Sequence, residues 1–268
     1  MIIRIIAMNK SVEKQSVSLL KRLLEILSIT IGITLFGLLI QGSNTWCNYV
    51  ELFDITEINI IGNTILSNQE ILRLANVHTD TSLRSINIPA VQKRLESNPY
   101  VKAAAVSREL PNRLNVLISE RIPICYINHN SLLLLDKDGI ILPIPEQAIG
   151  TNLPVISGFE NDSVDYYPGF YVPNQNILNI VETISQALIT MPDLFSQISE
   201  IHYWKDDSCI LYTVKDGTPI FFGKKKLSEQ LDILAHFQNR LQGKRNLSDY
   251  QYLDLRWEKQ IVAKERRS

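Results

Sequence analysis

The longest uninterrupted apolar run covers residues 26–40, and no charged residue occurs between Glu25 and Glu51. Uncharged residues extend this segment to Trp46, an aromatic residue suited to a membrane interface. A helix rises about 1.5 Å per residue, so about 20 residues cross the hydrocarbon core of a bilayer. The pattern therefore predicts a transmembrane helix at residues 23–46 that holds the chain in a lipid bilayer.

Two other structures share this pattern, a cleaved signal peptide and a buried core helix. A signal peptidase site needs small residues in an A-x-A-like arrangement, whereas residues 41–47 read Q-G-S-N-T-W-C. Cys47 also lacks the small apolar residues that precede the cysteine of a lipidation signal. We therefore expect an uncleaved anchor.

Charges on the two sides of the span predict its orientation. No basic residue follows the span before Arg73, whereas the preceding segment is basic. Positive flanks stay in the cytoplasm, so residues 1–22 are predicted to form a cytoplasmic tail. The rest of the chain is then exported, and the protein is bitopic in the inner (plasma) membrane. The basic residues before the span are Arg4, Lys10, Lys14, Lys21 and Arg22.

The first exported segment begins with strand-like alternation. Residues 55–61 alternate in polarity and end at Gly62-Asn63, a turn signal. Ser67 and Glu70 then have the spacing of a capping box, in which each side chain binds a backbone N–H at the start of a helix. A strand followed by a helix is therefore expected.

A second helix and a hairpin complete this module. Pro89 suits the first turn of a helix, and Asn98-Pro99 ends it. Residues 101–110 and 113–120 alternate in polarity on either side of a turn, which predicts a hairpin. Residues 51–123 therefore predict a small α+β module with the order strand, helix, helix, strand, strand.

The remaining sequence, residues 124–262, predicts a mixed or antiparallel β-sheet with amphipathic helices, so the exported fold class is α+β. Turn dipeptides at Asp138-Gly139 and Asp216-Gly217 predict two hairpins. Residues 252–262 alternate as one strand with a buried face, and residues 263–268 are expected to be a solvated tail. The other expected elements are helices at 177–188 and 227–241 and strands at 201–204, 209–214 and 220–222.

Composition narrows the function. The net charge of −1 argues against a broad nucleic-acid surface. Three cysteines are too few for a disulfide scaffold; Cys125 and Cys209 could pair, but both lie in apolar strand-like runs that favour buried free thiols.

Catalytic patterns are also missing. The four histidines are scattered, and we find no H-E-x-x-H, no paired cysteine spacing, no phosphate loop and no G-x-S-x-G. Asp136 and Asp138 lack the further ligands of a calcium loop. We therefore expect no catalytic residue, no cofactor, no metal, no small-molecule ligand and no enzymatic activity.

Three motifs carry a resemblance to a known family. Residues 55–63 read I-x-x-I-x-I-x-G-N, residues 98–106 read N-P-Y-V-K-x-A-x-V, and residues 111–123 read P-N-x-L-x-V-x-I-x-E-R-x-P. Their order resembles the POTRA (polypeptide-transport-associated) domain. A POTRA domain after one anchor with a cytoplasmic N-terminus resembles the FtsQ/DivIB bacterial cell-division family. Two later motifs agree, L-P-x-x-x-G at residues 153–158 and D-L-R followed by an aromatic residue at 254–257.

This resemblance implies a divisome scaffold at the division septum, which recruits and links cell-division proteins. It implies that the POTRA domain takes part in recruitment. It also implies that the edge of the C-terminal strand captures an FtsB-like protein in complex with an FtsL-like one, since a partner segment can add a strand to an exposed edge. The expected partner-binding residues are Arg256, Trp257, Lys259, Gln260, Ile261 and Val262.

Alternative roles remain open for these residues and for the chain. Arg256 is expected to contact an acidic partner residue, or it is simply solvated. Trp257 provides an aromatic contact surface, or it belongs to the core on the face of Leu253 and Leu255. The chain itself could be a POTRA-type factor in secretion or outer-membrane assembly that handles client strands, or a membrane-tethered enzyme acting on the cell wall.

Overall fold

The structure, a computed structural model, describes residues 2–266 except 80, 146–152, 160–163, 205–207, 224–225, 242–243 and 258–259, and side chains from residue 21 onward except 23 and 48. Backbone contacts divide the chain into two compact units. One contains Met1–Asn59, Val77–Asn87 and Ser107–Asn115; the other contains Ile60–Asn76, Ile88–Val106 and Val116–Ser268.

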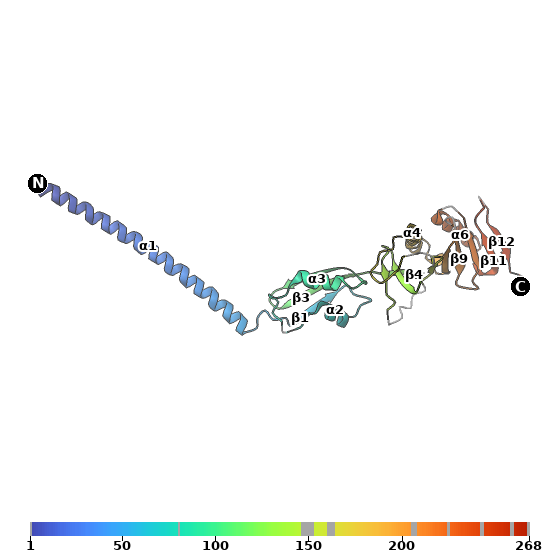
Figure 1. Cartoon of the computed structure of the whole chain (residues 1–268), viewed down its shortest axis with the longest axis horizontal. Coiled ribbons are helices and arrows are strands. Elements are labelled where there is room, and N and C mark those ends of the chain that lie inside the picture. Colours follow the sequence, from blue (N-terminus) through green and yellow to red (C-terminus); the bar gives the residue numbers. More distant parts are fainter. Residues whose placement is uncertain are drawn as a thin grey trace. The chain divides into compact units, whose positions relative to one another are not determined.

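Helix α1, Ile2–Tyr49, contains the predicted span (Figure 1). Its segment Leu24–Cys47 is long and apolar enough to cross a membrane, and the most apolar part of this segment is not buried inside the protein. Hydroxyl groups within the span donate to carbonyl oxygens three or four residues earlier, which satisfies them without water. These donors are Ser28, Thr30, Thr34 and Thr45. The predicted helix is confirmed, and its crossing of a bilayer stays a prediction.

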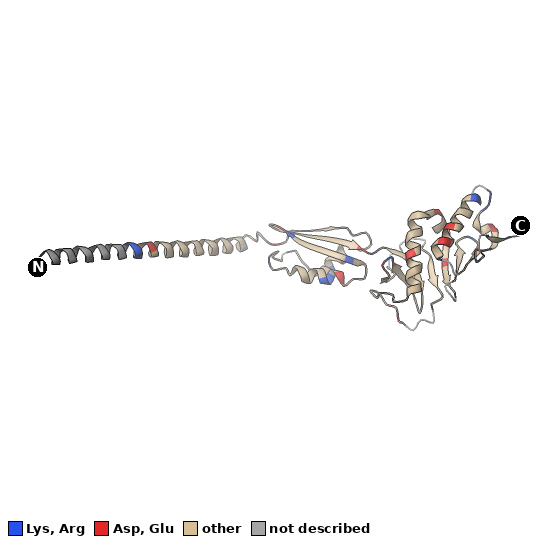
Figure 2. Ribbon diagram, turned by 90° about the horizontal axis from the view of Figure 1, so that it is seen from above, with Lys and Arg blue, Asp and Glu red and all other residues tan. Residues whose placement is uncertain are grey.

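The predicted α+β module is confirmed, with three strands in the order β1-β3-β2. Its helices lie on one side of the sheet (Figure 2), and their buried side chains include Ile71 and Ala75 from α2 and Val91 and Leu95 from α3. The elements are β1 Glu57–Ile61, α2 Asn68–Ala75, α3 Ile88–Glu96, β2 Val101–Glu109 and β3 Arg113–Glu120.

Hydrogen bonds at the start of α2 match the predicted capping box. The Ser67 Oγ accepts from the Glu70 backbone N–H at 3.3 Å, and the Glu70 Oε2 accepts from the Ser67 N–H at 2.8 Å. These bonds to Ser67 lower the pKa of Glu70. Gly62, in the predicted turn before this helix, has φ +92°, and a Cβ there would lie 2.1 Å from the Ile118 carbonyl oxygen. Only glycine fits that position.

The Glu120 carboxylate at the end of β3 fixes the loop that leads into α2. It accepts backbone N–H groups from Thr64, Ile65 and Leu66 at 2.7, 2.7 and 2.9 Å. A carboxylate that receives several backbone donors binds a loop in one conformation, because each bond is charge-assisted. Glu120 is the glutamate of the E-R-x-P motif at residues 120–123, so holding this loop explains the presence of a glutamate in the motif.

The second sheet has nine strands in the order β12-β11-β10-β9-β8-β7-β4-β5-β6. It is mixed, which is one of the two predicted arrangements, because β4–β7, β7–β8 and β10–β11 are parallel and its other pairs are antiparallel. The strands are β4 Pro123–Asn128, β5 Leu132–Asp136, β6 Ile141–Leu142, β7 Val155–Ser157, β8 Ile198–Tyr203, β9 Cys209–Thr213, β10 Pro219–Phe222, β11 Tyr250–Asp254 and β12 Val262–Glu265.

Both predicted hairpins and both predicted amphipathic helices are present. Residues Gly139 (φ +78°) and Gly217 (φ +56°) lie in the turns after β5 and β9. The apolar face of α4 joins sheet residues such as Ile127, Ile156 and Leu211 in one core. Strand β7 was not predicted, and β4 was indicated only by the apolar strand-like run around Cys125. The helices are α4 Gln175–Thr190, α5 Pro192–Phe195, α6 Leu227–Leu241 and the 3₁₀ turn Leu247–Asp249.

The predicted single strand at 252–262 is wrong, and the predicted tail at 263–268 is wrong for residues 263–265; residues 267–268 lie outside the described residues. The chain forms two antiparallel strands there, β11 and β12, and residues 263–265 belong to β12. The Asp254 Oδ1 accepts the backbone N–H of Arg256 at 3.0 Å. This local bond from a side chain to the backbone two residues later turns the chain and ends β11.

The cysteines of the second sheet are free. Both Cys125 and Cys209 are buried thiols. Burial raises the pKa of Cys125 well above its ordinary value, because the thiolate form would lose its hydration. The expectation of buried free thiols is confirmed for this pair.

A buried ion pair fixes the β5–β6 hairpin. Arg121 Nη1 lies 2.8 Å from the Asp136 carboxylate, and only 2% of the Asp136 side chain is exposed. The other carboxylate oxygen accepts the backbone N–H groups of Asp138 and Ile140 at 2.9 and 2.8 Å. These three contacts explain why Asp136 is charged yet buried, and they show that the aspartate holds the turn.

We predict that Asp136→Ala lowers the free energy of unfolding by about 3 kcal/mol, because it leaves two backbone N–H groups without their acceptor and Arg121 with only the longer contact to Asp138, at 3.4 Å, among the described carboxylates. Urea denaturation of the full chain in detergent measures this loss. The matched control is Asp138→Ala, since Asp138 pairs with Lys102 at 2.6 Å on the surface, and it should lose less than about 1 kcal/mol. Equal losses in the two variants would contradict the role of Asp136.

Candidate partner-binding edge

Strand β12 lies at one end of the nine-stranded sheet and pairs with β11 alone among the described strands. All four of its residues are exposed. An edge strand presents a row of backbone N–H and C=O groups that can pair with another chain. The position of β12 therefore makes its outer side a candidate for strand addition.

The hydrogen-bond pattern shows which backbone groups of β12 point outward. The Arg266 N–H donates to the Asp249 carbonyl at 3.0 Å, so Arg266 faces β11. Successive residues of a strand direct their backbone groups to opposite sides. Glu265 and Ala263 therefore direct their N–H and C=O groups outward, while Lys264 directs its groups toward β11.

Arg256, a predicted partner-binding residue, is held by its own chain. Its Nε and Nη2 donate to the two Asp254 carboxylate oxygens at 2.9 and 2.6 Å. Its guanidinium also lies over the Phe221 ring, 5.2 Å from the centroid. Hydrogen bonding to Arg256 lowers the pKa of Asp254 and raises that of Arg256. The arginine side chain remains 55% exposed, so its other N–H groups are open to a partner.

Trp257 does not join the core with Leu253 and Leu255. Its exposed fraction is 59%, because β11 ends at Asp254 and the strand alternation stops with it. Trp257 lines a surface groove of about 550 Å³ between α6 and the segment before β12. The other groove residues are Ile233, His236, Phe237, Arg240, Leu255, Gln260 and Ile261.

The structure brings most of the predicted residues together. Gln260 and Ile261 line the same groove as Trp257, and Val262 begins β12. Lys259 lies outside the described residues. The prediction missed Ala263 and Glu265, whose backbone groups form the outer edge. Asp254 could have indicated that the strand ends there, because an aspartate side chain often accepts the backbone N–H of the residue two positions later and so forms a turn.

A serine, a histidine and a glutamate meet on β7 and β8, and their order differs from that of a catalytic triad. The Ser157 hydroxyl contacts Glu200 Oε1 and lies 2.8 Å from His202 Nδ1, whereas Glu200 Oε1 is 3.9 Å from that nitrogen. In a triad the histidine lies between the hydroxyl and the carboxylate and is oriented by it. Here the hydroxyl lies in the middle, so this arrangement does not support nucleophilic catalysis.

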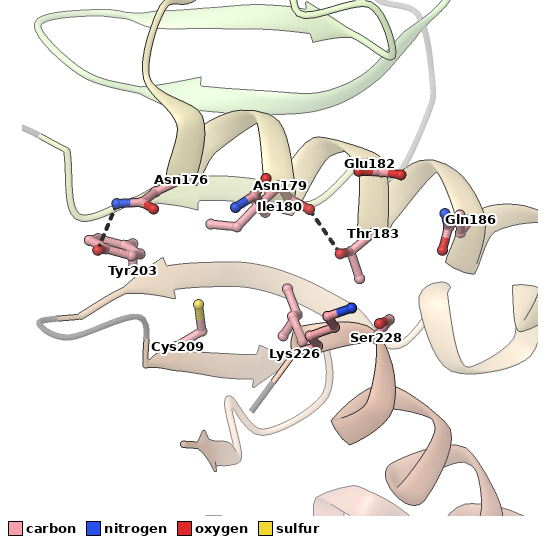
Figure 3. A pocket seen from close by; sticks show the side chains of 11 residues that line it. Asn176, Asn179, Ile180, Glu182, Thr183, Gln186, Tyr203, Cys209, Lys226 and Ser228 are labelled. Atoms are coloured by element: carbon pink, nitrogen blue, oxygen red, sulfur yellow. Dashed lines mark hydrogen bonds between the residues drawn. The ribbon is translucent and has the colours of Figure 1, made fainter. Parts of the chain in front are cut away.

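A second hollow follows one side of α4 (Figure 3). Its wall carries uncharged polar side chains from α4, including Asn176, Asn179, Thr183 and Gln186. Asn176 donates to the Tyr203 hydroxyl at 2.8 Å. Within the described part of the chain, no cluster of three or more histidine, cysteine, aspartate or glutamate side chains has the geometry of a metal site.

Comparison with models of known protein families identifies the family of this chain. A model described as POTRA domain, FtsQ-type, matches residues 53–121, and one described as Cell division protein FtsQ/DivIB, C-terminal, matches residues 125–256. The chain belongs to the FtsQ/DivIB cell-division family. The second match ends at Arg256, so both β11 and the Asp-Leu-Arg turn lie within the FtsQ/DivIB region.

Named FtsQ and DivIB proteins agree with this assignment. Cell division protein FtsQ of Geobacter sp. (strain M21) is 29% identical over 201 residues, which cover 74% of this chain and 71% of that protein. The FtsQ of Geotalea daltonii is 28% identical over 212 residues, 79% of this chain and 76% of that protein. Cell division protein DivIB of Clostridium acetobutylicum is 27% identical over 115 residues, 42% and 46% of the two chains.

We predict that Asp254→Asn reduces the acid sensitivity of the protein. The folded-state pKa of Asp254 is lowered, so its carboxylate stabilises the fold above the unfolded value of about 3.9, and this contribution is lost as the pH falls through the folded pKa. The variant should therefore be less stable at pH 7 and should lose less stability than the parent on acidification.

Urea midpoints measured between about pH 6 and pH 2.5 test this expectation. Asp232→Asn on α6 is the control, since Asp232 is exposed and forms no ion pair among the described residues. An Asp254→Asn profile with the slope of the parent would show that the pair with Arg256 adds nothing to stability.

Proposed function

We propose that this FtsQ/DivIB protein is a bitopic divisome scaffold that captures a segment of an FtsB-like partner, in complex with an FtsL-like one, by strand addition to β12. The single observation that carries the proposal is the outward row of backbone groups on β12, at the free end of the sheet. An added strand would pair with Ala263 and Glu265, and each main-chain bond contributes affinity without depending on partner sequence.

The groove beside β12 would supply selectivity. Trp257 and the α6 residues Ile233 and Phe237 give the groove an apolar part next to the edge, and aromatic residues in such positions often dominate binding energy. The exposed part of Arg256 would contact an acidic partner residue. Lys259, Gln260, Ile261 and Val262 complete the proposed contact segment.

The charge pattern around the span supports the location. We propose an inner-membrane protein at the division septum, with its N-terminus in the cytoplasm, because the basic residues precede α1's apolar segment. We assign residues 51–123 to the POTRA domain and extend the β domain to residue 265, since β12 pairs with β11. The match to the FtsQ/DivIB C-terminal model favours this role over a POTRA factor in secretion.

We predict that Ala263→Pro weakens capture of an FtsB-like protein up to about tenfold, because it removes one outward N–H from the edge. Proline is tolerated on an edge strand where the N–H faces solvent, so the fold should survive. Pull-down by the full chain measures capture, and circular dichroism checks the fold. Ala263→Val keeps the N–H and is the control; unchanged binding by a folded Ala263→Pro variant would exclude strand addition at this position.

Ile261→Pro is a poorer test of the edge. Ile261 packs against the core of the second sheet and lies before β12 begins. Its replacement would disturb the groove and the backbone together. Ala263 separates the two, because its side chain is exposed and its N–H points outward.

We also predict that Trp257→Ala weakens capture about tenfold or more, since it removes the largest exposed side chain of the groove. Trp204→Ala is the matched control because Trp204 is similarly exposed, at 55%, but does not line this groove. The same pull-down compares the two variants. A comparable effect of both substitutions would place the partner elsewhere.

A further inference from the structure

A hollow of about 740 Å³ lies beside the C-terminal end of the apolar span, within the unit that contains α1. Apolar side chains and a glycine line one part, and polar side chains line the other. Asn44 lies seven positions after Gly37, which separates the two parts by about 10 Å along the helix. The residues used below are Gly37, Leu39, Ile40, Asn44, Phe53 and Arg84.

Arg84 is the charged group of this hollow. Its Nη1 donates to the Asn44 Oδ1 at 2.9 Å, and its guanidinium lies 4.5 Å from the centroid of the Phe53 ring. Its side chain is exposed, and no carboxylate among the described residues forms an ion pair with it. The two contacts hold the guanidinium in place while most of its donors remain available to an anion.

The hollow lies at the level where a spanning α1 would leave the bilayer. Asn44 is near the end of the segment Leu24–Cys47, and Trp46 and Tyr49 are exposed beside it. Tryptophan and tyrosine concentrate at the interface between lipid and water, where phosphate headgroups lie. Gly37, Leu39 and Ile40 would then face acyl chains, and Arg84 would face phosphates.

We propose that this hollow binds an anionic phospholipid, with the phosphate on Arg84 and Asn44 and an acyl chain along α1 beside Gly37. Guanidinium groups bind phosphate oxygens through paired, charge-assisted hydrogen bonds. The absence of a side chain at Gly37 leaves room for the chain, since a Cβ there meets nothing within 4 Å. A bound lipid would hold the exported residues around Arg84 against the outer face of the membrane that α1 spans.

This site rests on the bilayer span and is separate from partner capture at β12. Arg84 and Gly37 lie outside the groove and the edge strand. Variants of the hollow should therefore retain full capture of the FtsB-like partner. Conversely, failure of the strand-addition tests leaves the lipid site unaffected.

The experiment uses the full chain in nanodiscs of phosphatidylglycerol and phosphatidylcholine, released into detergent for native mass spectrometry. The parent should retain phosphatidylglycerol in preference to phosphatidylcholine. Arg84→Gln should lower this retention by about tenfold or more, because it removes the charged donor. Arg84→Lys should retain an intermediate fraction, since the charge remains and the paired geometry is lost.

Two matched controls test whether a loss of retention is specific to this hollow, and not a general result of removing a positive charge or adding an apolar side chain. Arg73→Gln removes an exposed arginine on α2 and should not change retention. Gly37→Leu should lower retention by filling the acyl path, whereas Gly32→Leu, outside the hollow, should not. Retention unchanged in both Arg84→Gln and Gly37→Leu would overturn the proposal, as would equal losses in the two controls. Full displacement of the lipid by glycerol phosphate would also overturn the proposal, because a phosphate group without an acyl chain would then be sufficient to occupy the site.

Discussion

The ion pair between Arg121 and Asp136 is the contact on which the second sheet depends at its start. It joins the residue after β3 to the end of β5, and the same carboxylate fixes the turn into β6 through two backbone N–H groups. A buried aspartate is stable only with such partners. The neighbouring Glu120 fixes the loop before α2. The Glu-Arg pair of the POTRA motif is thus explained by structure.

At the other end of the sheet, β12 has one edge that pairs with no described strand. This end therefore leaves backbone groups exposed, whereas the ion pair at the first end fixes a turn. Asp254 turns the chain after β11, so that residues 262–265 return as β12 instead of continuing outward. The turn also holds Arg256 and exposes Trp257 beside α6. One local hydrogen-bond pattern therefore sets the free edge and its groove together. The Asp-Leu-Arg motif acts on the proposed binding surface mainly through backbone geometry.

The hydroxyl groups of α1 and the guanidinium of Arg84 differ in how their hydrogen-bonding capacity is satisfied. Hydroxyls within α1 are satisfied by the helix itself, as a lipid environment requires. Among the described residues, Arg84 in contrast forms no ion pair and contacts the neutral side chains of Asn44 and Phe53, where the apolar segment ends. A cation in that place suits the lipid phosphates, whereas the edge of β12 suits a polypeptide. The two proposed surfaces would therefore use different interactions for different partners.

Sequence alone determined the elements whose signal is local. The apolar span, the capping box of Ser67 and Glu70, the turns at Gly139 and Gly217 and the faces of α4 and α6 follow from periodicity or from one turn's chemistry. Three of the residues predicted from sequence to bind a partner, Trp257, Gln260 and Ile261, line one groove in the structure. Only the tertiary structure decided that β4, β7 and β8 pair in parallel, that β12 folds back on β11, and that Trp257 is exposed. The parallel pairing and the return of β12 depend on contacts between residues distant in sequence, which periodicity does not encode. The turn at Asp254 has a local signal, but alternation through residue 257 favoured a continuous strand.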